Sequence, residues 1–339
     1  MKASLLRLCP LLLLLTGCFT TTNKDAIVPF NREQANALLA KARAPQVFGL
    51  TAYTSDAGPV FAGAHRVHQG DVARLNFQGD RTSTAPIIIL DGRGKLNLPA
   101  LLDTCARDSW VSAAAGAQLS VTLLSGPPPY QAVAAHVYDD IGGAAGVAQK
   151  VMLEESHIEN VIFYLRLAKG PLGPLARWLN DPTPVAVLGS SFLRAFSFVQ
   201  VDYPQRKTVF SSSTRFPPPS EETLVAKIPL KEILGVPAVD GALDGDPVTV
   251  LLDTAGDYEL VMNEPSSDTI RRLSIGDLVF PPDVKVVSSM DQGLGPISYP
   301  RVGRRLLARY KITFDFKGKS VFFDRPALAE AERKSLLGN

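Results

Sequence analysis

Two aspartates and the threonines that follow them carry the clearest chemical signal in this sequence. Asp103-Thr104 and Asp253-Thr254 each end an apolar run that contains two consecutive leucines. Burying one carboxylate is costly, but two that face each other share one proton, because like charges held close together cannot both ionise. One carboxylate could then take a proton from a water while its protonated partner polarises a carbonyl. Such a pair performs general acid–base hydrolysis of an amide without a covalent intermediate.

The elements around these aspartates occur twice in the chain. The run 98–104, Leu-Pro-Ala-Leu-Leu-Asp-Thr, is matched by the run 248–254, Val-Thr-Val-Leu-Leu-Asp-Thr. Each copy continues with an apolar element that contains a glycine and with a closing hairpin, in residues 187–193 and 198–210 of the first copy and 301–307 and 312–323 of the second. Either aspartate alone would be an ordinary turn residue, but three features repeated in the same order indicate two copies of one β lobe.

From about residue 47 onward the chain is typical of a mostly antiparallel β protein. Short apolar or alternating runs, separated by Gly, Pro, Asp and Asn, predict strands at 72–77, 87–90, 117–124, 151–153, 161–167, 196–202 and 208–210. Residues 213–222 hold three consecutive prolines and predict a linker, because proline cannot serve a central strand. We therefore expect two lobes, residues 45–212 and 223–326, followed by a C-terminal helical tail, residues 327–339.

The doubled apolar-Asp-Thr strand end, the glycine element and the closing hairpin resemble the aspartic proteases, both pepsin-like and retropepsin-like, over residues 47–326. The resemblance implies a mostly β, two-lobed acid-protease-like fold whose lobes are related by a pseudo-two-fold axis. It also implies that Asp103 and Asp253 form the catalytic dyad. Thr104 and Thr254 would bond across the axis and hold the two turns together.

The resemblance assigns further residues around the dyad. Gly189 and Gly303 match the glycine where the strand pair crosses behind the active turn. In the first lobe, residues 138–151 match the hairpin that closes over substrate in the family. Its flap candidates are Tyr138, Gly142, Gly143 and Gly146. A second flap has no clear counterpart in the shorter stretch of the second lobe.

The residue after each Asp-Thr departs from the family pattern, which has glycine because the backbone there passes close to the carboxylate. Cys105 follows in the first copy and Ala255 in the second. We expect Cys105 to be a small buried filler that crowds the floor of the active site. The sequence leaves three functions open: an aspartic-type endopeptidase, a non-catalytic peptide-binding protein of the same fold, or a structural lipoprotein with a different β architecture.

The N-terminus predicts export and lipid anchoring. Residues 1–17 combine an early lysine with an apolar run, as signal peptides do, and this run is too short for a permanent transmembrane helix. Its end, Leu-Thr-Gly-Cys18, resembles the bacterial lipobox, in which the cysteine carries the lipid. Because Phe19 rather than Asp follows, we expect a lipid-anchored protein of the bacterial cell envelope, at the outer rather than the inner membrane. Residues 18–44 would form a tether with a helix at 32–42 that Asn31 caps.

Composition excludes several other classes of function. The net charge is +2 over 339 residues, and no basic stripe is present, so nucleic acid is not an expected partner. The four histidines lack metal-ligand spacing, and we expect neither metal nor cofactor. We expect a monomer whose partners are a peptide or protein substrate and, through its lipid, the membrane. The basic cluster of Arg301, Arg304 and Arg305 is interpreted as a solvated face.

Overall fold

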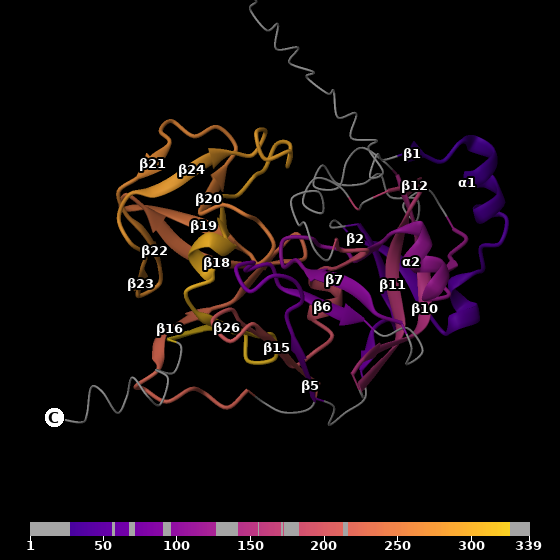
Figure 1. Cartoon of the computed structure of the whole chain (residues 1–339), viewed down its shortest axis with the longest axis horizontal. Helices are drawn as coiled ribbons and strands as arrows, with labels where there is room; N and C mark the ends of the chain where they lie inside the picture. Colours follow the sequence, from indigo (N-terminus) through magenta and orange to yellow (C-terminus); the bar gives the residue numbers. More distant parts are fainter. Residues whose placement is uncertain are drawn as a thin grey trace, which may run out of the picture.

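The computed structural model describes residues 28–55, 58–67, 72–90, 96–126, 142–154, 156–170, 172, 183–212 and 216–325. The predicted signal peptide, Cys18, Tyr138 and the predicted C-terminal tail lie outside these ranges. The described chain is mostly β, as predicted. Two large sheets, one from each half of the chain, are joined by a third sheet that runs along the lower part of the view in Figure 1.

The first lobe contains an eight-stranded sheet in the order β6-β7-β13-β8-β11-β10-β9, with β4 pairing on β11. Its strands are β4 (Arg66–Val67), β6 (Ile87–Leu90), β7 (Leu98–Leu102), β8 (Trp110–Val111), β9 (Thr122–Leu123), β10 (Gly143–Leu153), β11 (Ser156–Arg166) and β13 (Ala186–Leu188). Along this order β6 and β7 are antiparallel, β7 and β13 parallel, β13 and β8 antiparallel, and β8 and β11 parallel.

The second lobe contains a nine-stranded sheet in the order β21-β24-β20-β25-β19-β18-β22-β23, with β17 pairing on β18. Its strands are β17 (Lys231–Ile233), β18 (Val236–Leu243), β19 (Asp246–Asp253), β20 (Leu260–Met262), β21 (Thr269–Ile270), β22 (Leu273–Ile275), β23 (Leu278–Val279), β24 (Val284–Ser288) and β25 (Arg301–Gly303). The run β18-β19-β25-β20-β24 has the same alternation of antiparallel and parallel pairs as β6-β7-β13-β8-β11. The sequence repeat is therefore also a repeat of strand order.

A six-stranded sheet, in the order β16-β27-β26-β14-β15-β5, joins the lobes. Its strands are β5 (Val72–Asn76), β14 (Phe198–Asp202), β15 (Lys207–Ser211), β16 (Leu224–Pro229), β26 (Lys311–Asp315) and β27 (Ser320–Asp324). The two closing hairpins lie side by side through antiparallel β14 and β26, where Gln200 donates to the hydroxyl of Thr313 at 3.0 Å. Beside this sheet, Phe216 of the predicted linker packs between Phe198 and Phe322.

The N-terminal segment folds onto the first lobe. It consists of β1 (Val28–Pro29), which pairs with β12 (Ala168–Lys169), helix α1 (Arg32–Leu39), the 3-10 helix η1 (Pro45–Phe48) and a hairpin of β2 (Thr51–Ser55) and β3 (Gly58–Ala62). The predicted cap is confirmed, because the Asn31 side chain accepts from the backbone N–H of Gln34 at 2.8 Å. Leu38 and Leu39 pack α1 against the core of the first lobe.

One predicted strand is wrong in part. The run 117–124 begins inside helix α2 (Ala113–Gln118), and its strand, β9, consists of Thr122 and Leu123 alone. Ser112 starts this helix, because its hydroxyl accepts from the backbone N–H of Ala115 at 3.2 Å. Alanine is the best helix former, so the alanine-rich stretch after the cap outweighs its apolar alternation.

Three large buried clusters and two smaller ones stabilise the described chain. One fills the first lobe and one fills the second. The third lies between the lobes, where Leu101, Trp110 and Tyr164 of the first lobe meet Ala255 and Tyr258 of the second. The described residues include no helix that is both long enough and apolar enough to cross a membrane.

Candidate active site

The two Asp-Thr turns meet and bond to each other. The hydroxyl of Thr254 accepts from the backbone N–H of Thr104 at 3.1 Å, and the hydroxyl of Thr104 accepts from the N–H of Thr254, also at 3.1 Å. Each hydroxyl in turn donates across to the other lobe, Thr254 to the carbonyl oxygen of Leu102 at 2.8 Å and Thr104 to that of Leu252. These reciprocal bonds join the ends of β7 and β19, from opposite halves of the chain.

Both carboxylates are buried and are held in the same way. Asp103 is 1% exposed and Asp253 is 2% exposed. Oδ1 of Asp103 accepts from the backbone N–H groups of Cys105 and Ala106 at 2.8 and 2.9 Å. Oδ1 of Asp253 accepts from the N–H groups two and three positions further along, at 3.0 and 2.8 Å. Each turn therefore aims two backbone donors at its own carboxylate, and these bonds hold the two carboxylates in equivalent orientations.

Gly189 and Gly303 lie directly behind these turns. A Cβ atom at Gly189 would sit 2.4 Å from the carbonyl oxygen of Asp108, and one at Gly303 would sit 2.3 Å from that of Tyr258. No side chain fits at such distances, so close backbone approach requires glycine at both places. Helix α4 (Ser190–Leu193) follows the first glycine and α5 (Arg304–Leu307) follows the second.

Cys105 and Ala255 each pack into the opposite lobe. Cys105 contacts Val236, Ala238 and Leu251 of the second lobe, whereas Ala255 belongs to the cluster that is mostly from the first. Neither residue has a positive φ, so the backbone at these places accepts a side chain. Burial, and then the charge of Asp253, raises the pKa of the Cys105 thiol well above its ordinary value. The thiol therefore stays protonated and acts as a buried filler.

The glycine flap candidates lie in a strand. Gly143 and Gly146 belong to β10, where Gly146 pairs with Phe163 of β11 and with Leu123 of β9. The turn between β10 and β11 follows Leu153, far along the strand from both glycines. Gly142, just before β10, accepts from the backbone N–H of residue 167 at 3.0 Å. The connection between β9 and β10 falls on residues 127–141, outside the described residues, and includes Tyr138.

Tyr258 is a site residue that the sequence reasoning missed. Its hydroxyl donates to Oδ2 of Asp253, the carboxylate oxygen that the backbone donors leave free. Its ring lies over two glycines, since a Cβ at Gly256 would sit 2.4 Å from Cζ of Tyr258 and Gly303 is equally crowded. Burial, and then the charge of Asp253, raises the pKa of the phenol well above its ordinary value, so Tyr258 remains a donor. In the sequence, Gly256 was the one sign that a large side chain packs close to the backbone after Asp253.

Arg301 is a second missed residue. It lies opposite Leu251 in the parallel pair of β19 and β25, on the same face as Leu251 and Asp253. Two residues along a strand span about 6.6 Å, so a long arginine side chain reaches the region of the dyad. Nε of Arg301 is buried and has no hydrogen-bond partner among the described residues.

Acidic groups around Arg301 determine the direction in which its pKa is shifted. Burial acts to lower the pKa of Arg301, but these groups raise it above its ordinary value. They are Cys105, Tyr258, Asp253 and Asp103. Because the thiol and the phenol stay protonated, the two aspartates supply the negative charge at neutral pH. Arg301 is therefore a cation placed within the field of both carboxylates.

The interpretation of the basic cluster as a solvated face is wrong for two of its three members. Besides Arg301, Arg304 is only 6% exposed, and its Nε donates to the carbonyl oxygen of Ala255 at 3.2 Å. Only Arg305 is exposed, where it pairs with Asp257 at 3.0 Å. The signal that distinguishes the three is position, because Arg301 lies within β25 and Arg304 is the first residue of α5.

Among the described residues, no group of three or more His, Cys, Asp or Glu side chains is placed to hold a metal ion. No family model matches the chain, and no curated protein matches it. Among solved structures, the crystal structure of basic 7S globulin from soybean is similar with a TM-score of 0.46 and 12% identity, over 76% of this chain and 95% of that chain. A likeness of this strength says nothing about activity, so function must be argued from the site.

Proposed function

We propose that this protein is an aspartic-type endopeptidase of the bacterial cell envelope, in which Asp103 and Asp253 activate one water between them. The mutual bonding of the two Asp-Thr turns carries the proposal. It brings one buried carboxylate from each half of the chain to a common centre through Thr104 and Thr254. A pseudo-two-fold axis between the repeated strand orders would pass through this centre.

The proposed reaction needs one proton shared by the two carboxylates. The ionised carboxylate takes a proton from the water, whose oxygen attacks the peptide carbonyl carbon, while the protonated carboxyl donates to the carbonyl oxygen. The tetrahedral intermediate then collapses and the C–N bond breaks. One hydroxyl of the intermediate returns its proton to the ionised carboxylate, and the leaving amine takes the proton of the other carboxyl, so the dyad ends singly protonated as it began. No covalent enzyme intermediate forms, and Cys105 has no part in the step.

Arg301 sets the pH range in which this dyad would work. A singly protonated pair carries one negative charge, which the guanidinium of Arg301 offsets. The same cation favours loss of the shared proton, because a nearby opposite charge stabilises the ionised form of an acid. Activity requires the singly protonated form, so it should decline as pH rises toward neutral.

A second candidate is a non-catalytic peptide-binding protein of the same fold. Arg301 favours it, because a guanidinium beside two carboxylates can keep both of them ionised. A doubly ionised pair has no proton to give to a carbonyl oxygen. Such a site would bind a peptide without cleaving it.

Lipid anchoring through Cys18 completes the proposal, with the chain held at the outer membrane. Its support is the lipobox-like end of the apolar N-terminal run. Changing Cys18 to Ser should release the protein from the membrane or leave an unprocessed precursor, because one acylated residue supplies the anchor. Phase partitioning with a detergent measures this change. A variant that still partitions fully into the detergent phase would argue against lipidation.

Digestion of a peptide library by the purified protein, from acid to neutral pH, tests the proposed activity. We expect cleavage that is strongest at acidic pH and absent from Asp103→Asn, since asparagine keeps the shape of aspartate but cannot trade a proton. Arg305→Met serves as a matched control for handling and folding, because Arg305 is exposed. A wild-type protein that binds peptides but cleaves none at any of these pH values would replace the endopeptidase with the non-catalytic candidate.

A further inference from the structure

A cavity away from the dyad offers a second place for a ligand. It has a volume of about 360 Å³ and lies between the β2–β3 hairpin, helix α4, the turn after Asp103 and the β17–β18 hairpin of the second lobe. Neither Asp103 nor Asp253 is among its described lining residues. We call this cavity the hairpin pocket. The residues that define it here are Val60, Phe61, His65, Ile162, Ser191 and Arg194.

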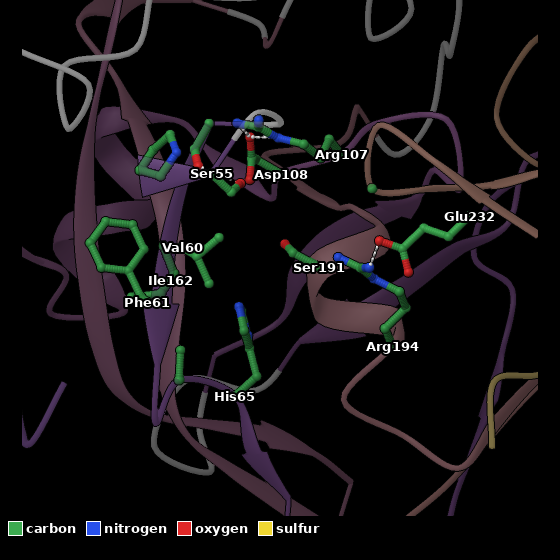
Figure 2. Close-up of a pocket in the computed structure, with 14 residues that line it drawn as sticks. Ser55, Val60, Phe61, His65, Arg107, Asp108, Ile162, Ser191, Arg194 and Glu232 are labelled. Carbon is green, nitrogen blue, oxygen red and sulfur yellow. Dashed lines mark hydrogen bonds and ion pairs between the residues drawn. The ribbon is translucent and has the colours of Figure 1, made fainter. Parts of the chain in front are cut away.

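His65 presents a ring nitrogen to the hairpin pocket. Its backbone N–H donates to the carbonyl oxygen of Asn160 at 3.0 Å, and its ring packs edge-on against Phe192 with centroids 5.9 Å apart. Figure 2 shows a ring nitrogen of His65 pointing into the hollow between Val60 and Ser191. Nδ1 is buried and has no hydrogen-bond partner among the described residues, so contact with a ligand falls to the ring nitrogen that faces the hollow. A fixed ring with a nitrogen toward the hollow marks a place for a ligand.

The charges around the pocket are balanced. Arg107 pairs with Asp108, and Arg194 pairs with Glu232. Burial, and then the positive charge of Arg194, lowers the pKa of His65 to about 4. The imidazole is therefore neutral at physiological pH and offers one donor and one acceptor. Because two cations are matched by two anions, the pocket favours an uncharged ligand over an anion or a cation.

The remaining walls define the shape and polarity of that ligand. Val60, Phe61 and Ile162 line an apolar side of the pocket. In Figure 2 the hydroxyl oxygen of Ser191 faces the same hollow as the ring of His65. An amide supplies one N–H donor and one carbonyl acceptor, which matches a neutral imidazole beside a hydroxyl. Pockets for small ligands begin at about 300 Å³, so the space suits one short apolar residue with its flanking amides.

We propose that the hairpin pocket binds an uncharged peptide unit, with its amide on His65 and Ser191 and its apolar side chain on Val60, Phe61 and Ile162. Arg107, which lines the pocket, follows Asp103 by only four residues. A peptide anchored here would thus be held close to the turn that carries the first aspartate. The site is built from other residues than the dyad and does not require hydrolysis.

Titration of the purified protein with N-acetyl-leucinamide tests the proposal, with the nitrogen NMR signals of the His65 ring as the readout. We expect saturable binding in the millimolar range that shifts the His65 signals, since a ligand of this size binds weakly. His157→Gln identifies the signals of the other described imidazole. Asp253→Asn should bind equally well, which separates this site from the fate of the proposed hydrolysis.

Two variants and one altered probe make the titration decisive. Ser191→Ala should weaken binding about threefold to tenfold, as the loss of one hydrogen bond does. His65→Phe keeps a ring against Phe192 and should abolish binding, which is followed in this variant by the backbone amide signal of Ser191 because the His65 ring signals are gone. N-acetyl-leucine, which carries a carboxylate in place of the amide, should bind more weakly. Three results would each overturn the proposal: no saturable shift of the His65 signals, unchanged affinity in Ser191→Ala, or tighter binding of N-acetyl-leucine. The shift and the comparison of the two probes are measured on the wild-type protein, so they do not depend on the folding of a variant.

Discussion

The two lobes share a strand order but differ in the side chain that each places beside the dyad. In the first lobe Val187 of β13 lies between Leu101 and Trp110, with a parallel partner on one side and an antiparallel partner on the other. In the second lobe Arg301 takes the same place, between Leu251 and Val261. The repeat therefore preserves the backbone that positions the carboxylates. The side chains on that backbone have diverged into an apolar wall and a cation.

The supports behind the two turns differ in the same way. After Gly189, Ser190 braces the first turn through a short hydroxyl that donates to the carbonyl oxygen of Thr104 at 2.7 Å. After Gly303, Arg304 braces the second turn through a long guanidinium that donates to the carbonyl oxygen of Ala255. Equivalent places in the two lobes thus supply the same kind of support with different side chains. The difference shows which features depend on the backbone and which depend on one residue.

Replacing either aspartate gives the largest effect and tests the equivalence of the lobes. Asp103→Asn and Asp253→Asn should each lower kcat for peptide hydrolysis by about a thousandfold or more, because proton transfer and carbonyl polarisation both require the acid. Steady-state kinetics at acidic pH measures this loss. The double variant should be no worse than either single variant, since the residues act as one unit. Additive losses would show that the two lobes act separately.

Replacing Arg301 tests the main difference between the lobes. Arg301→Met removes the cation that favours loss of the shared proton, so the pH at which activity falls should rise by about one to two units. The sign follows from charge: without the guanidinium the singly protonated pair persists to higher pH. The pH profile of kcat/KM measures the shift, and Arg305→Met should leave the profile unchanged. A shift toward lower pH would contradict the placement of Arg301 beside the dyad.

Removing the threonine hydroxyls tests the bonding that unites the lobes. Thr104→Val and Thr254→Val keep the side-chain volume but leave a buried N–H and a buried carbonyl without these partners, so each should cost about 2–4 kcal/mol of unfolding free energy. Chemical denaturation measures both values. The costs should be similar, because the bonds are reciprocal, and the double variant should lose less than the two combined. Unequal costs would mean that one turn depends more on the other, and additive costs would mean that the two sets of bonds act independently.

Replacing Cys105 gives the smallest expected effect. Cys105→Ala removes one buried sulfur from its contact with the second lobe and should lower the unfolding free energy by about 1 kcal/mol, mostly through lost packing. Hydrolysis should change by less than about twofold. Thermal unfolding and kinetics at one acidic pH measure the two quantities. Loss of activity without loss of stability would instead assign the thiol a chemical role.

The repeated strand order and the two buried strand-end aspartates could be predicted because they depend on local patterns. Asp103 and Asp253 end apolar runs whose length and pattern are typical of buried strands. The glycines at 189 and 303 are required because another backbone segment passes close to each of them. The cross-bonding of the threonines came from the family resemblance, and the structure contains it. Strand-end carboxylates and glycines required by close backbone contacts can thus be recognised in a single sequence.

Other features depend on contacts between distant segments and could not be predicted in that way. Arg301 looks like one of three clustered surface arginines until its register with Leu251 is known. Tyr258 looks like an ordinary loop residue until two glycines are seen to make room for its ring. Gly146 is a flap candidate by resemblance, yet it lies in a long strand where a Cβ atom would sit 2.5 Å from the side chain of Val121.

The central claim is that Asp103 and Asp253 share one proton, and carbon NMR titration of their carboxyl groups tests it most directly. The account predicts that both signals respond in each of two coupled steps, with one proton lost per step. It also predicts that Asp253→Asn leaves Asp103 with a single step. Two independent single-step titrations, each unaffected by replacement of the other aspartate, would contradict the account.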